Sequence, residues 1–249
     1  MGLPTIKVPK FTLNLPISEI EVKARPFLIR EQKVLLQAIE IGNKNEVQLA
    51  LDEIMTECTF NEIDIDELPV PDVEYLMLHL RSKSVGEEIK MTYTCHNLIP
   101  DEENKKNKEL IDCGNRINLN ININSIKIKE FDNHNSKLIF DGGIGIELRD
   151  IPYGVYKNSV GDKNSLNKTM TLRNSCVKSV FDQDRVWTRN EFNDEELNKF
   201  IDNLYTNDYE KIEAFIETMP ILEHIINLQC PNCGHKEKIT LKGLDDFLE

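Results

Sequence analysis

The pentapeptide CPNCG at residues 230–234 constrains this 249-residue chain more than any other stretch of its sequence. It places two residues between Cys230 and Cys233, so both thiols can bind one metal ion from a single turn. Zinc in structural sites takes four ligands in a tetrahedral array, and thiolates are among its preferred ligands. CPNCG therefore predicts half of a zinc site, and the other two ligands must come from elsewhere in the chain.

Cys95 and Cys113 are the candidates for the other half, because the sequence around them is similar to the sequence around CPNCG. A run that alternates apolar with polar residues leads into the first cysteine of each pair, and another follows the second cysteine. This alternation has the period of a half-buried strand. Each pair is therefore predicted at the tip of a β-hairpin, with the two hairpins joined in a zinc-ribbon-like site. The four strand-like runs are residues 88–94, 117–123, 225–229 and 236–241.

The two predicted hairpin tips differ in length. Seventeen residues separate Cys95 from Cys113, and they include a charged run at 101–109 that we interpret as a solvated insertion in the turn. A glycine follows the second cysteine of each pair, at Gly114 and Gly234. Glycine adopts positive φ angles readily, and we expect both glycines to turn the backbone so that its amides face the sulfurs.

Two alternatives to a four-thiol site remain open from the sequence. Cys95 and Cys113 could be ordinary reduced thiols, with CPNCG acting as a redox pair. A redox C-x-x-C normally opens a helix in a βαβ setting, whereas the residues after CPNCG have the pattern of a strand. His96 and His235 lie beside candidate ligands, and either could replace a cysteine.

The remaining cysteines and the densest group of carboxylates carry no predicted chemistry. Cys58 and Cys176 lie within helical patterns, where a lone cysteine usually behaves as a small buried hydrophobe. Asp64, Asp66 and Glu67 crowd one stretch that we interpret as a loop facing water. The chain has no nucleophile elbow, HExxH motif or phosphate-binding loop. The sequence therefore predicts a protein that is not an enzyme.

The composition indicates a globular protein whose partners are other proteins. The chain is 40% hydrophobic and 29% charged, which suffices to bury a core as one large domain or two small ones. Its formal net charge of -13 disfavours nucleic acids and anionic membranes as partners. Residues 1–16 do not have the pattern of a signal peptide, and no apolar run approaches the length of a membrane span. We expect a reducing cytoplasm, where paired cysteines more often bind metal than form disulfides.

Hydrophobic periodicity predicts an α+β fold in which helical segments pack with antiparallel β-hairpins. An Asp-Gly-Gly sequence at 141–143 predicts a hairpin turn. We interpret residues 1–249 as a single domain, with sub-regions at 1–84, 85–150 and 151–249. Apart from those around the cysteines, the expected strands are residues 10–15, 19–24, 126–129, 137–140, 144–148 and 185–188. The expected helices are residues 27–41, 45–58, 72–80, 165–181, 193–204, 207–216 and 243–249. Asp72 and Asn207 are the expected N-cap residues of the third and the sixth of these helices.

Six short motifs have no obvious chemical purpose, and their joint occurrence is therefore specific. They are RPFLIREQKVL at 25–35, CTF at 58–60, LPVPDVEYL at 68–76, LRSKSVGE at 80–87, FIETMP at 215–220 and KGLDDFLE at 242–249. Together they make the chain resemble the baseplate hub assembly chaperone or baseplate hub protein family of T-even-type, contractile-tailed bacteriophages. The resemblance extends over nearly the whole chain.

The resemblance implies a viral protein, made in the cytoplasm of the infected host cell, that helps to build the central hub of a tail baseplate. It implies no catalysis, and it implies phage hub proteins as partners. The chain could be an assembly factor that leaves the hub, or a permanent baseplate subunit that stays in the virion. Zinc would be a structural cofactor in either case.

An unrelated alternative is a zinc-ribbon adaptor that acts on host transcription or on nucleic acid. Such proteins usually place lysines and arginines around the metal hairpins. In this chain the lysines near CPNCG are balanced by acidic residues, which weakens that alternative. The lysines are Lys236, Lys238 and Lys242, and the acidic residues are Glu237, Asp245 and Asp246.

Two of the motif segments, RPF at 25–27 and SKSVGE at 82–87, are candidates for facing a partner or for fixing the fold. A Pro-Phe pair before a helix is more often a hydrophobic staple than a docking element. The sequence therefore favours the second role for RPF.

Overall fold

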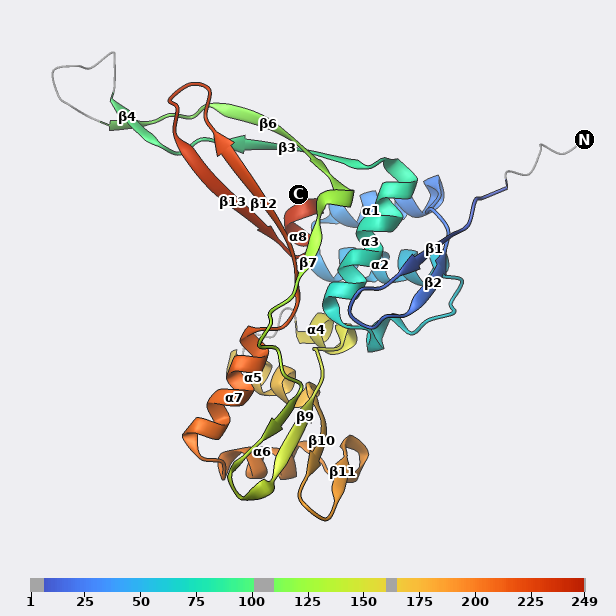
Figure 1. The fold of residues 1–249 in the computed structure, drawn as a ribbon. Coiled ribbons are helices and arrows are strands. Elements are labelled where there is room, and N and C mark those ends of the chain that lie inside the picture. Colours follow the sequence, from blue (N-terminus) through green and yellow to red (C-terminus); the bar gives the residue numbers. More distant parts are fainter. Residues whose placement is uncertain (1–6, 101–109, 160–164, 249) are drawn as a thin grey trace, which may run out of the picture.

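The computed structural model describes residues 7–100, 110–159 and 165–248, and it shows an α+β protein (Figure 1). A helical body lies at one end, an arm of two long hairpins projects from it, and a lobe of helices and strands lies at the other end. All strand pairs within the described ranges are antiparallel, as predicted. The charged run at 101–109 lies outside the described residues.

The helical body is built from the first third of the chain. Apolar side chains from its opening hairpin and its helices form one core, whose buried members include Leu15, Val22, Ile54, Leu76 and Leu80. The two strands and three helices were all predicted. They are β1 (Phe11–Asn14), β2 (Glu21–Ala24), α1 (Ile29–Ile41), α2 (Lys44–Cys58) and α3 (Val70–Val85), with a 3-10 turn at Ile65–Glu67 before α3.

Asp72 fastens helix α3 to the opening hairpin. The prediction that a helix begins at Asp72 is wrong, because α3 begins at Val70, directly after Pro69. The Asp72 carboxylate instead accepts hydrogen bonds from the backbone amides of Ile17 (2.9 Å) and Ser18 (2.7 Å), in the turn between β1 and β2. Asp72 is fully buried, so these two amides replace the water that its carboxylate gives up on folding.

The RPF and SKSVGE segments contact each other beside this core. The backbone N–H of Phe27 donates to Ser84 Oγ at 2.8 Å. Arg25 is buried, and its Nη2 lies 3.0 Å from Oε1 of the buried Glu31 on α1. Glu31 also accepts a hydrogen bond from the backbone N–H of Leu28, which is left without an intrahelical partner where α1 begins. These contacts support a fold-fixing role for both segments.

The arm consists of two hairpins that lie side by side (Figure 1). Strand β3 pairs with β6 in the first hairpin, and β12 pairs with β13 in the second. A short strand, β7, extends the second hairpin by pairing with the base of β12. The bounds are β3 (Glu88–Thr94), β6 (Arg116–Asn122), β7 (Lys127–Lys129), β12 (Ile221–Gln229) and β13 (Lys236–Lys242), with a 3-10 turn at Ile123–Ser125.

Apolar packing between the two hairpins weakens from the base of the arm to its tip. At the base, Ile89 and Leu222 are buried in one cluster with Phe247 of the short terminal helix α8 (Asp245–Leu248). Further out, Met91 and Ile226 are only partly buried. Isolated two-stranded hairpins are marginally stable in water, so the outer half of the arm needs another source of stability.

Part of the insertion between Cys95 and Cys113 forms a second pair of strands. Strand β4 (Leu98–Pro100) pairs with β5 (Leu110–Asp112) and prolongs the first hairpin beyond the cysteines. Leu98 and Leu110 are 60% and 58% exposed, so these strands are solvated as expected of the insertion. Their pairing was not predicted.

The lobe at the other end contains a four-stranded sheet, in the order β11-β10-β9-β8, covered by helices. The Asp-Gly-Gly turn joins β8 to β9, as predicted, and Gly142 and Gly143 have φ angles of 86° and 80°. The strands are β8 (Lys137–Ile139), β9 (Gly145–Leu148), β10 (Val177–Phe181) and β11 (Val186–Thr188). The helices are α5 (Ser165–Ser175), α6 (Asp194–Asp202) and α7 (Thr206–Glu217), and 3-10 turns lie at Asp141–Gly143 and Arg189–Glu191. Helix α4 (Tyr153–Ser159) lies between the lobe and the helical body (Figure 1), and Tyr153 is buried in the core of the body.

Two predictions for this lobe are wrong. The helix expected at 165–181 ends at Ser175, and the following residues form the central strand β10, where Val177 and Ser179 are buried. Pairing with β9 and β11 decides this segment, because strand formation depends on tertiary neighbours more than on local pattern. Asn207 does not cap the next helix, because α7 begins at Thr206, after Tyr205.

We expect Glu31→Gln to lower the free energy of unfolding by about 3 to 5 kcal/mol at pH 7, since it removes the buried charged partner of Arg25 and leaves it only the exposed Glu57, 3.8 Å away. Burial raises the pKa of Glu31, but hydrogen bonds from Arg25 and from the Leu28 amide outweigh it and hold that pKa at about 2. The stability is therefore present above the usual carboxyl pKa and is lost as the pH falls towards 2. Urea unfolding at pH 7 and at lower pH measures both effects.

The matched control is Glu67→Gln, the same chemical change in the exposed Glu67–Arg149 ion pair. It should cost less than about 1 kcal/mol. Equal losses in the two variants would show that the Arg25–Glu31 pair does not stabilise the helical body.

Candidate metal centre

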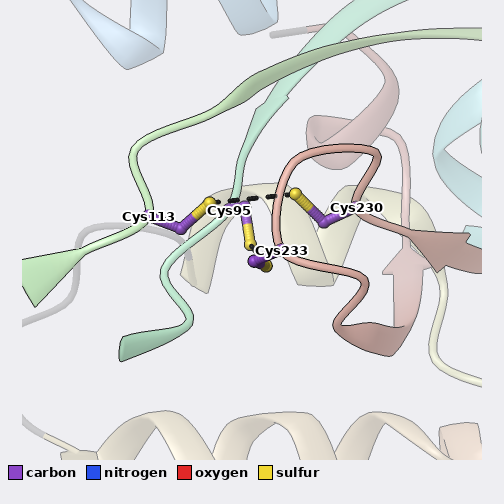
Figure 2. A group of neighbouring side chains, drawn as sticks. All are labelled: Cys95, Cys113, Cys230 and Cys233. Carbon is purple, nitrogen blue, oxygen red and sulfur yellow. Dashed lines mark hydrogen bonds between the residues drawn. The ribbon is translucent and has the colours of Figure 1, made fainter. Parts of the chain in front are cut away.

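The four predicted cysteines lie together between the tips of the two hairpins (Figure 2). All four Sγ atoms are within 4.8 Å of one another. The Sγ atoms of Cys95 and Cys233 are 3.7 Å apart, and those of Cys113 and Cys230 are 3.8 Å apart. Each of these close contacts joins one hairpin to the other, so a shared ligand would cross-link the arm.

These distances fit a tetrahedral metal. Four sulfurs at the usual zinc–sulfur distance of about 2.3 Å, placed at the corners of a tetrahedron, are separated by about 3.8 Å. The two contacts that join the hairpins already have that separation. The four cysteines could therefore bind one zinc ion with little movement of the backbone.

The two hairpin tips share the same backbone hydrogen bonds despite the insertion in the first. The N–H of Gly114 donates to the Cys95 carbonyl at 3.0 Å, and the N–H of Gly234 donates to the Cys230 carbonyl at 2.9 Å. Both glycines have positive φ angles, 63° and 74°, as predicted. The insertion therefore leaves the geometry of the metal-binding turn unchanged.

Three asparagine side chains donate towards the sulfurs, and sequence reasoning missed them. Asn97 Nδ2 lies 3.7 Å from Cys233 Sγ, and Asn232 Nδ2 lies 3.4 Å from Cys113 Sγ. Each of these two asparagines stands two residues after the first cysteine of its own hairpin and reaches the second cysteine of the other. Asn115 Nδ2 adds a third contact, at 3.7 Å from Cys230 Sγ. Comparison of Cys-His-Asn at 95–97 with Cys-Pro-Asn at 230–232 could have revealed the first two of these asparagines.

Hydrogen bonds and burial separate the pKa values of the first cysteines of the two tips. The backbone amides of Cys233 and Asn232 are among the groups that lower the pKa of Cys230 to about 6. The backbone amide at Asn97 lowers the pKa of Cys95, but burial and the neighbouring thiols raise it to about 12. Four thiolates at this spacing repel one another, so a divalent cation would favour their joint deprotonation.

The two histidines beside the cysteines are directed elsewhere. His96 Nδ1 lies 2.8 Å from Asp112 Oδ2, and the side chain of His96 is 70% exposed. His235 is exposed, and its contribution to the turn is a carbonyl that accepts the Cys230 N–H at 2.8 Å. Neither ring belongs to the group of clustered ligand atoms in the described residues.

CPNCG leads into strand β13 instead of opening a helix, so it lacks the setting of a redox C-x-x-C. Cys58 and Cys176 lie outside the cluster, and both are buried as predicted. Burial raises the pKa of Cys58 to about 11 and that of Cys176 to about 12. These two thiols are consequently poor metal ligands and poor nucleophiles.

We expect the purified protein to contain about one zinc ion per chain, bound by the four clustered cysteines. Cys230→Ser should abolish stoichiometric zinc and loosen the arm, because three thiolates hold the ion less tightly. Elemental analysis of the desalted protein measures the first effect, and hydrogen exchange of residues 88–94 the second. Cys176→Ala is the control and should keep its zinc. Wild-type protein without metal after expression in zinc-containing medium would contradict the assignment.

We expect Asn97→Ala and Asn232→Ala each to weaken zinc binding by about tenfold to a hundredfold, because outer hydrogen bonds tune bound ligands to this extent. Competition with a chromophoric chelator measures the affinity. Asn118→Ala is the matched control, since Asn118 lies on β6 and accepts a hydrogen bond from Thr92 away from the sulfurs. Equal affinity in all three variants would assign the asparagines no role at the site.

Comparison with known proteins gives one family and one relative. The model of the T4 bacteriophage base plate protein family matches residues 8–249. The chain is 22% identical over 240 residues to the baseplate hub assembly protein gp26 of Enterobacteria phage T4. The alignment covers 96% of this chain and 98% of that protein. No solved structure matches the chain significantly.

Within the described ranges, no helix is long and apolar enough to cross a membrane. The resemblance noted from the six sequence motifs is confirmed by the family match, which includes all of them. The chain belongs to the T4 bacteriophage base plate protein family.

Proposed function

We propose that this protein is a non-enzymatic assembly factor for the central hub of a phage tail baseplate, which binds hub proteins in the host cytoplasm. The observation that carries the proposal is the alignment with a baseplate hub assembly protein along nearly the full length of both chains. The alignment covers 96% of this chain and 98% of that relative, so the similarity is not limited to one module of either.

Zinc, in this proposal, is a structural cofactor held by Cys95, Cys113, Cys230 and Cys233. Four protein ligands leave no open position for water or substrate, so the metal would not take part in a reaction. Its effect would be to hold together the outer half of the arm, where apolar packing is incomplete.

Two cavities among the described residues support a binding protein more than an enzyme. One, of about 500 Å³, is lined by Asp52, Asp66 and Lys157 among others. Lys157 Nζ lies 2.8 Å from Asp52 and 2.5 Å from Asp66, so the one lysine of this cavity is held by two of its carboxylates. The other, of about 460 Å³, is lined only by residues of β3 and β6, with Lys90 as its one ionisable side chain.

A zinc-ribbon adaptor for nucleic acid has weaker support. The lysines of β13 are exposed, but Glu237 lies between them and accepts a hydrogen bond from the Tyr93 hydroxyl of the other hairpin. The whole chain carries a formal net charge of -13, which opposes approach to a polyanion.

An assembly factor should be present in baseplate precursors and absent from mature virions. Quantitative mass spectrometry of purified precursors from infected cells, beside purified virions, measures this chain against the hub subunits present in both. We expect a fixed ratio in precursors and loss of the chain on maturation, because an assembly factor leaves after the hub has formed.

Equal ratios in precursors and virions would identify a permanent structural subunit and would contradict departure from the hub. Absence from both samples would contradict any role in hub assembly. The zinc content of the protein is decided separately by elemental analysis, so the two parts of the proposal can fail independently.

A further inference from the structure

Helix α1 presents an apolar stripe to solvent. Ile29, Leu36 and Ile39 are 66%, 52% and 50% exposed. Of the thirteen residues of α1, Glu31 and Ala38 are its buried members. Three large aliphatic side chains on one helix face form an unusual surface for an isolated soluble protein.

The stripe has the spacing of a coiled-coil seam. Ile29 and Leu36 are seven residues apart, and Ile39 follows Leu36 by three. Ile29 and Leu36 therefore occupy the a positions of two successive heptads, and Ile39 occupies the d position of the second. Gln32 takes the remaining d position. Leu35 lies on one flank of the seam and packs into the core of the helical body, which leaves only the opposite flank free.

The free flank carries one charge of each sign. Lys33 and Glu40 are both exposed, are seven residues apart, and lie on the same side of the seam. Neither takes part in an ion pair within the described part of the chain. Their midpoint lies next to Leu36, the centre of the seam.

This pattern is complementary to itself when the helix is reversed. If two copies of α1 pack antiparallel about a two-fold axis near Leu36, Lys33 of each copy lies beside Glu40 of the other. The same arrangement brings Leu36 against Ile39 of the second copy. In a two-fold interface, the same surface of both copies must be complementary to itself, as it is here. A partner whose surface carried charge of one sign would be repelled by either Lys33 or Glu40.

We propose that the protein forms a homodimer through α1, with the two helices antiparallel and two Lys33–Glu40 pairs flanking the apolar seam. The contact is on the helical body and uses none of the cysteines, so it does not depend on zinc. It also does not depend on the proposed role in hub assembly.

Sedimentation velocity of the full-length protein over a wide concentration range tests the proposal. Wild type should show a reversible monomer–dimer equilibrium. Leu36→Asp should raise the dissociation constant by about tenfold or more, because it puts a charge in the centre of an apolar contact. Leu36 is exposed in the monomer, so the variant should fold, and circular dichroism checks this. Val186→Asp, at a 57% exposed aliphatic residue on β11, is the control and should dimerise as wild type does.

Charge reversal tests the antiparallel register. Lys33→Glu and Glu40→Lys should each weaken the dimer by about twofold to fivefold, since each places like charges opposite one another. The double variant restores opposite charges in both pairs and should recover the wild-type dissociation constant.

A monomer at every concentration would overturn the proposal, and so would a dimer insensitive to Leu36→Asp. Failure of the double variant to recover affinity would overturn the antiparallel pairing. Protection of α1 from hydrogen exchange only after purified hub proteins are added would assign the stripe to a different partner.

Discussion

The contact between four sulfurs from two hairpins is the constraint on which the arm depends. It joins Cys113 to Cys230 and Cys95 to Cys233 across 117 and 138 residues of sequence. Near the helical body the hairpins share a buried apolar cluster, and towards the tip the side chains between them are only partly covered. The cysteines lie where that packing ends and the exposed strands β4 and β5 begin. A metal ion bound at this position would supply stability that a two-stranded hairpin cannot obtain from burial.

The cysteines, the two glycines and the flanking strands could be predicted because each depends on local chemistry. Two thiols on one turn, glycine at a positive φ angle and period-two alternation are all visible in a short window of sequence. The asparagine contacts are different, because Asn97 and Asn232 each donate to a sulfur of the other hairpin. They become visible only when the two hairpins are placed together, or when the two tips are compared as repeats of one motif.

The errors in the fold have the same origin. Residues 177–181 have a local pattern compatible with a helix, yet they form the strand β10 because β9 and β11 lie on both sides of it. Asp72 has the right chemistry for a helix cap, yet its carboxylate is occupied by two amides some 55 residues away. In both cases a partner distant in sequence outweighs a local preference of about 1 kcal/mol or less.

The residues of the family motifs that form contacts within the chain stabilise the fold more than they provide a docking surface. Arg25, Phe27 and Ser84 are occupied by one another and by Glu31, and such contacts leave little for a partner to bind. The exposed stripe of Ile29, Leu36 and Ile39 begins within the same motif as RPF and continues past it, on the opposite side of the helix from Glu31 and Ala38. One short stretch of sequence thus anchors helix α1 through its buried face and leaves an uncovered apolar face exposed to solvent. Association through the second face, as proposed, would account for leucine and isoleucine at positions that folding of the isolated chain does not require.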